Sequence, residues 1–123
     1  MNQDEKIAFL ESFGVDAKTG VSNMMDIETY DEIMNDFYDS LPEEISKIDQ
    51  FKNQNDMANY AIEVHGLKSD SKYLGFVKLA ELSYQHEMAS KQNDINYVNE
   101  HYNELINEVN RVYAILTKYK AMV

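Results

Sequence analysis

The chain has 123 residues, of which 44% are hydrophobic, enough to bury the core of one domain but too few for a separate catalytic domain beside it. Its net charge of −11 argues against nucleic acid or an anionic membrane as a partner, because both would be repelled. The lack of cysteine excludes disulfides, thiolate zinc sites and cysteine nucleophiles, and fits a reducing compartment.

From the composition of its first residues, the chain is expected to carry no targeting signal. Residues 1–10 are polar and acidic, without the basic and apolar regions of a secretory signal. No run approaches the ~20 apolar residues that a membrane span needs.

One proline, four glycines and many good helix formers favour helix almost throughout. We therefore expect a soluble, cytoplasmic, all-α protein.

The first 25 residues are predicted to form a short N-terminal helical extension. The spacing of apolar residues predicts a helix over residues 3–13, ended by Gly14. Residues 15–25 contain a glycine and several small polar residues. They predict a loop, with one helical turn over residues 22–25.

Longer apolar stripes at helical spacing follow. The first covers residues 27–48 and is interrupted by Pro42, which predicts either two abutting helices or one kinked helix. The next helix has Asp56 as a candidate N-cap and ends at Leu74 and Gly75. These two segments are therefore predicted to form helices that pack against a common core.

Two further helices complete the chain. One is predicted over residues 76–90, with a turn at residues 92–93. The last, from Ile95 to Tyr119, has a heptad seam and either Asn93 or Asp94 as its cap. Antiparallel bundles use the same period as coiled-coil dimers, and we prefer packing within the chain. The prediction is one domain over residues 1–123, a monomer, with an antiparallel four-helix bundle at about 27–120.

One stretch joins a nucleophilic side chain to local positive charge. His65 lies beside the apolar stripe of its helix rather than within it. Lys68, Lys72 and Lys78 follow it against a single acid, Asp70. Neutral imidazole is nucleophilic near pH 7, and its phosphorylated form would carry negative charge that Lys68, Ser69 and Lys72 could meet with hydrogen bonds.

The pattern H-x-L-K-x-x-x-x-x-L-G, from His65 to Gly75, resembles the histidine-containing phosphotransfer (HPt) domain of multistep two-component signalling. The resemblance covers roughly residues 21–119. It implies that His65 accepts a phosphoryl group from an aspartate on a receiver domain and passes it to another, while Lys68 helps to neutralise it. It also implies a phosphoryl carrier without autonomous catalytic activity and without a cofactor of its own, because the receiver supplies Mg²⁺. The implied partners are response-regulator receiver domains and a hybrid sensor histidine kinase.

The chain departs from the family pattern at two positions. Ser69 stands where the family usually has glycine, and Gly66 stands where threonine, serine or alanine is commoner. The alternative function is therefore a helical interaction module that binds a receiver or kinase without transfer. Small and apolar neighbours of His65 would let a partner approach closely. The predicted binding residues are Ala61, Ile62, Ser69, Lys72 and Gly75.

The other histidines are interpreted as structural. His86, followed by Glu87, stands where the family more often has leucine before glutamate, and we read it as a residue at the edge of the core. His101 lies among acidic residues and is predicted on a solvated face. Neither Glu-x-x-His nor the zinc-protease pattern occurs, so no metal site is predicted.

Overall fold

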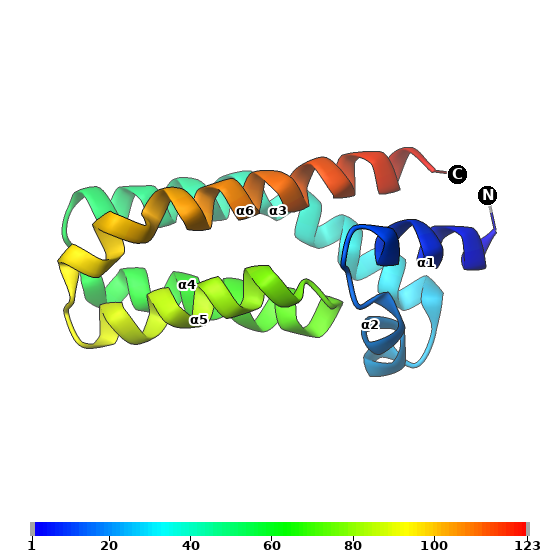
Figure 1. Ribbon diagram of the computed structural model, residues 1–123, viewed down its shortest axis with the longest axis horizontal. Coiled ribbons are helices and arrows are strands. Elements are labelled where there is room, and N and C mark those ends of the chain that lie inside the picture. The colour runs from blue at the N-terminus through cyan, green and yellow to red at the C-terminus, as the bar shows by residue number, and fades with distance from the viewer. Residues whose placement is uncertain (1, 123) are drawn as a thin grey trace.

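The computed structural model describes residues 2–122, and this range contains six helices and no strand. It confirms the predicted all-α fold, an antiparallel four-helix bundle preceded by a short helical extension (Figure 1). None of the described helices is both long and apolar enough to cross a membrane. The extension consists of α1 (Gln3–Ser12) and α2 (Ala17–Met24), and the bundle of α3 (Ile27–Asn53), α4 (Met57–Leu74), α5 (Val77–Lys91) and α6 (Ile95–Ala121).

Aspartate caps define the starts of four helices. Asp16, Asp26, Asp56 and Asp94 each accept a hydrogen bond from the backbone N–H three residues further on. The prediction for Asp56 is thus confirmed, and of the two candidate caps of the last helix, Asn93 and Asp94, the structure shows Asp94. Because each cap satisfies a donor that the helix cannot pair internally, it fixes where the helix begins.

The loop prediction for residues 15–25 is wrong, because most of this segment is α2. The glycine that suggested a loop, Gly20, lies inside this helix. A Cβ at this position would collide with the Tyr30 ring and the Leu74 carbonyl. Glycine is therefore needed here for close packing of α2 rather than for a turn.

Of the two alternatives at Pro42, the structure shows one continuous helix. Proline lacks a backbone N–H, so the helix forfeits only the hydrogen bond to the carbonyl four residues earlier. The Ser40 hydroxyl donates to the Phe37 carbonyl and does not act as an N-cap. The low helix propensity of Pro42 therefore does not end α3, because the residues on both sides of it are anchored in the core.

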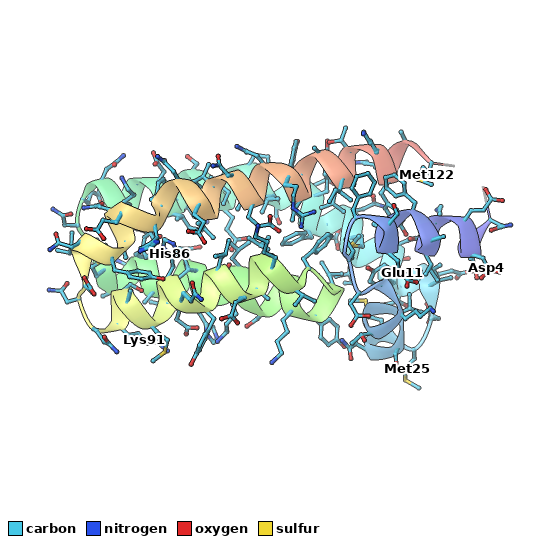
Figure 2. The ribbon with its side chains drawn as sticks, in the orientation of Figure 1. Asp4, Glu11, Met25, His86, Lys91 and Met122 are labelled. Atoms are coloured by element: carbon cyan, nitrogen blue, oxygen red, sulfur yellow. The ribbon has the colours of Figure 1, made fainter. Side chains whose placement is uncertain are left out.

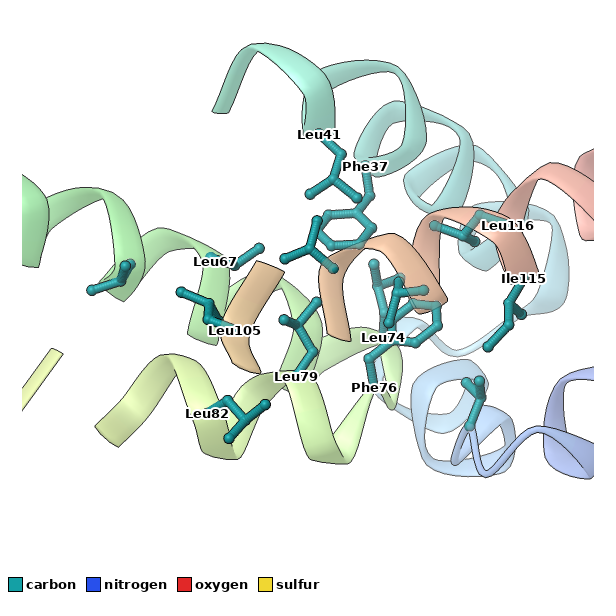
Figure 3. Close-up of a cluster of buried hydrophobic side chains, with 14 of the residues drawn as sticks. Phe37, Leu41, Leu67, Leu74, Phe76, Leu79, Leu82, Leu105, Ile115 and Leu116 are labelled. Atoms are coloured by element: carbon teal, nitrogen blue, oxygen red, sulfur yellow. The ribbon is translucent and has the colours of Figure 1, made fainter. Parts of the chain in front are cut away.

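The four bundle helices bury their apolar stripes in one core (Figure 3). The predicted seam of α6 is confirmed, since all of its members from Val98 to Tyr119 are buried and only Ile95 is partly exposed. The side chains labelled in Figure 3 come from all four bundle helices and, in the case of Phe76, from the N-cap of α5: Phe37, Leu41, Leu67, Leu74, Phe76, Leu79, Leu82, Leu105, Ile115 and Leu116.

Helix length explains where the extension packs. With 27 residues each, α3 and α6 are about 40 Å long, whereas α4 and α5 have 18 and 15 residues. The longer pair overhangs the shorter one, and α1 and α2 occupy that end (Figure 1). The Arg111 guanidinium donates to the Phe13 carbonyl, and the Asp16 N–H donates to the Gly75 carbonyl. The extension is thus fastened to both α6 and the end of α4.

We expect opposite effects from alanine at two glycines inside helices. Gly20→Ala should destabilise the protein by about 1–3 kcal/mol, because the added methyl group collides with Tyr30 and the Leu74 carbonyl. Gly66→Ala should stabilise it by about 0.5–1 kcal/mol, because a Cβ there meets only Glu44 Oε1, at 3.7 Å. Urea unfolding of both variants checks this, and equal effects would contradict the packing assigned to α2.

Candidate functional site

The site lies where α4 and α5 run side by side. His65 projects from α4, and its side chain is 56% exposed, as expected for a residue beside the core. Its helical neighbours Val64 and Leu67 are fully buried. The apolar stripe of α4 therefore anchors the helix while leaving the imidazole accessible to a partner.

A buried carboxylate from α5 organises this site. The Glu87 side chain is only 2% exposed, and its Oε2 lies 2.7 Å from His65 Nδ1 and 2.8 Å from Lys91 Nζ. Its Oε1 lies 2.7 Å from Lys68 Nζ. Figure 2 shows Lys91 near the end of α5, at the opposite end of the molecule from Met25. One carboxylate thus joins His65 to two lysines.

The charge state of Glu87 follows from these contacts. Burial alone would raise its pKa, but hydrogen bonds from Lys68, Lys91 and His65 outweigh burial and lower the pKa to about 2. Glu87 is therefore ionised at neutral pH and can only accept hydrogen bonds. The proton of neutral His65 must then sit on Nδ1, which leaves the lone pair on Nε2.

An open groove of about 630 Å³ begins at His65 and follows the contact between α4 and α5. Two predicted binding residues lie in it: Ala61 is 6% exposed and Ile62 is 66% exposed. The remaining lining consists of Met57, Ala58, His65, Glu87, Ser90, Lys91 and Asn93. The groove is mostly apolar, with the charged groups gathered around His65.

The other predicted binding residues lie further along α4. Ser69 and Lys72 are exposed, one and two turns beyond His65. Lys72 lines a second groove of about 350 Å³ together with Lys68. Gly75 is buried at the end of α4, about 15 Å along the helix axis from His65. Its φ of +98° is a backbone conformation that favours glycine, which accounts for this residue structurally.

The opposite side of α4 is acidic. Glu44 of α3 lies against Gly66, near Glu63 and Asp70. Burial raises the pKa of Glu44 to about 7, and the charges of Asp70 and Glu63 add to this effect. The side of α4 that faces α5 therefore carries the lysines, and the side that faces α3 carries the carboxylates.

The two remaining histidines differ in burial. His86 is 1% exposed and thus lies inside the core rather than at its edge. His101 is partly exposed, with its Nδ1 3.6 Å from Glu104 Oε2. Neither imidazole ring is hydrogen-bonded to Glu87. His86 and His101 therefore do not belong to the site at His65.

Sequence reasoning missed the roles of Glu87 and Lys91. A stripe at helical spacing on α5 holds the small residues Ala80, Ser83 and Ser90, all buried, and Glu87 belongs to this stripe. A glutamate among small residues on a helix that packs closely against its neighbour was the available signal. Lys91, four residues after Glu87, is then a natural ion-pair partner.

Comparison with protein families identifies the chain. The Hpt domain matches residues 32–114, which is more than half of the sequence. The chain therefore belongs to the Hpt domain family. Domains of this family act in the phosphorelay of two-component signalling as phosphoryl carriers, and they interact with receiver domains and histidine kinases. No curated protein and no solved structure gives a significant match.

We expect the contribution of Glu87 to stability to depend on pH. Its pKa of about 2 is below the ordinary value of 4.5, so the stabilisation is complete above pH 4.5 and is lost as the pH falls towards 2. The difference in unfolding free energy between wild type and Glu87→Gln should be up to about 3 kcal/mol near neutral pH and shrink below pH 4.5. Urea unfolding at several pH values measures this, and a difference that does not change with pH would rule out an ionised Glu87.

Proposed function

We propose that the protein is a phosphorelay intermediate that accepts a phosphoryl group on His65 from a receiver-domain aspartate and passes it to another receiver. The observation that carries this proposal is the hydrogen bond between His65 Nδ1 and the ionised Glu87 carboxylate. It leaves Nε2 as the nucleophile, in a side chain that is 56% exposed. The source of the phosphoryl group would be a hybrid sensor histidine kinase, and the place of action the cytoplasm.

The same hydrogen bond serves both states of the reaction. The Nε2 lone pair attacks phosphorus, the P–O bond to the receiver aspartate breaks, and the carboxylate leaves. The phosphorylated ring keeps its proton on Nδ1 and becomes positively charged, and Glu87, 2.7 Å away, stabilises that charge. Phosphoryl transfer requires mainly positioning and charge neutralisation, which a helix surface can supply if the receiver brings Mg²⁺.

Two lysines can respond to the new negative charge. Lys68 and Lys91 hold Glu87 before transfer, and Lys91 is 57% exposed, so its flexible side chain can turn towards the phosphoryl oxygens. Lys68 is less exposed, at 24%, and lies near the middle of α4. Replacement of Lys68 would therefore affect both the phosphoryl group and the buried carboxylate.

The receiver would dock on the exposed outer surface shared by α4 and α5. Most of the large apolar side chains exposed in the described residues lie on these two helices: Ile62, Tyr73, Val77, Tyr84 and Met88. Lysines lie between them, in a protein with a net charge of −11. Apolar area with local positive charge suits a partner whose active site is built of carboxylates.

Phosphorylation should depend on His65 alone. Incubation with a phosphorylated receiver and Mg²⁺ should label the wild type with an acid-labile, alkali-stable phosphoryl group, and His65→Gln should abolish the label. His101→Gln is the matched control, since its ring is also partly exposed, and it should be labelled normally. A small-molecule phosphoramidate donor tests whether the His65 ring can be phosphorylated when no receiver docks. Receiver binding without label from any donor would instead support the non-transferring module.

Docking should depend on Ile62. Ile62→Asp places a charge in the groove beside His65 and should raise KM for the phosphorylated receiver at least tenfold, while labelling by phosphoramidate stays unchanged. Ile33→Asp is the control, because Ile33 is also an exposed apolar residue but lies on α3, outside the proposed docking surface. Equal effects of the two substitutions would show that the docking surface lies elsewhere.

A further inference from the structure

A second polar contact joins α4 to α5, inside the core. The Tyr60 hydroxyl of α4 lies 2.8 Å from His86 Nδ1 of α5, and both residues are almost completely buried. The other ring nitrogen of His86, Nε2, lies 3.1 Å from the His101 carbonyl of α6. One imidazole thus links three helices of the bundle.

The directions of these hydrogen bonds are fixed. A carbonyl can only accept, so His86 Nε2 carries the proton and donates to His101. Burial lowers the pKa of His86, which keeps the ring neutral. Its Nδ1 therefore has a free lone pair and accepts the hydrogen bond from the Tyr60 hydroxyl. In this arrangement the Tyr60 hydroxyl and both ring nitrogens of His86 have hydrogen-bond partners.

This inner contact lies close to the site. His86 directly precedes Glu87 on α5, and Tyr60 lies five residues before His65 on α4. The pair of Tyr60 and His86 lies in the core, whereas in the other pair the buried Glu87 contacts His65, whose side chain is 56% exposed. The same two helices are therefore held by a directional hydrogen bond on each side. A small rotation or slide of α5 against α4 would strain both contacts together.

We propose that Tyr60 and His86 are positioning residues for phosphoryl transfer, whose hydrogen bond fixes α5 against α4 and so holds Glu87 at His65 Nδ1. This inference rests on the proposed function, because it assigns these residues to the same reaction. Apolar contacts between helices tolerate small displacements, but a 2.8 Å hydrogen bond between buried groups does not. The pair thus keeps the reactive tautomer of His65 populated.

The direct readout is the proton position on His65. The ¹⁵N chemical shifts of its ring distinguish a proton on Nδ1 from one on Nε2. Wild type should show Nδ1–H, and Tyr60→Phe should show a mixture of the two tautomers. In the same variant, kcat for transfer from a phosphorylated receiver should fall at least fivefold while KM stays unchanged, since the exposed docking residues are untouched.

Tyr30→Phe is the matched control. Its hydroxyl is also buried and donates to the Leu74 carbonyl, 2.8 Å away, near the opposite end of α4. This variant should lose stability as Tyr60→Phe does, yet keep the wild-type tautomer and rate. The double variant Tyr60→Phe with His86→Leu replaces the polar pair by an apolar one. It should be more stable than Tyr60→Phe, yet still show mixed tautomers and slow transfer.

The outcomes separate the two proposals. Wild-type tautomer and rate in Tyr60→Phe, or in the double variant should Tyr60→Phe not fold, would overturn the positioning role. Equal loss of rate in Tyr30→Phe would overturn it as well, because it would show a general effect of stability. Absence of label on wild-type His65 from every donor would overturn the proposed function instead. The ¹⁵N measurement still tests the hydrogen-bond link in that case.

Discussion

The ionised carboxylate of Glu87, buried between α4 and α5, is the interaction on which the site depends. A charge removed from water is costly unless it is paired and hydrogen-bonded. His65, Lys68 and Lys91 supply the partners, two at one oxygen and one at the other. The requirement to keep Glu87 paired ties these side chains together, and with them the position of α5 along α4.

This arrangement explains how a helix surface can carry a phosphoryl group. In the proposed transfer, the carboxylate would fix the tautomer of His65 beforehand and balance the positive charge of the phosphorylated ring afterwards. One or both of the lysines that pair with Glu87 would then be free to contact the phosphoryl oxygens. The proposed reaction would thus redistribute charges that are already present at the site.

The sequence predicted the parts of the fold that apolar periodicity and caps determine. The seam of α6, the cap at Asp56 and the exposed position of His65 beside its stripe all appear in the structure. Periodicity did not reveal α2, because Gly20 is required by the neighbouring Tyr30 and not by its own backbone. It also did not reveal Glu87, since two of the three partners that permit burial of its charge, His65 and Lys68, come from another helix.

The two sides of α4 carry opposite charges, which favours one direction of approach for a charged partner. Glu63, Gly66 and Asp70 follow one line along this helix, towards Glu44 of α3, while His65, Lys68 and Lys72 follow another, towards α5. A carboxylate-rich partner would be repelled from the first line and attracted to the second, so approach over α5 is favoured before any contact forms. A protein of net negative charge could in this way bind an acidic partner at His65. The lysines that pair with Glu87 lie on the side of α4 where the His65 ring is exposed to solvent.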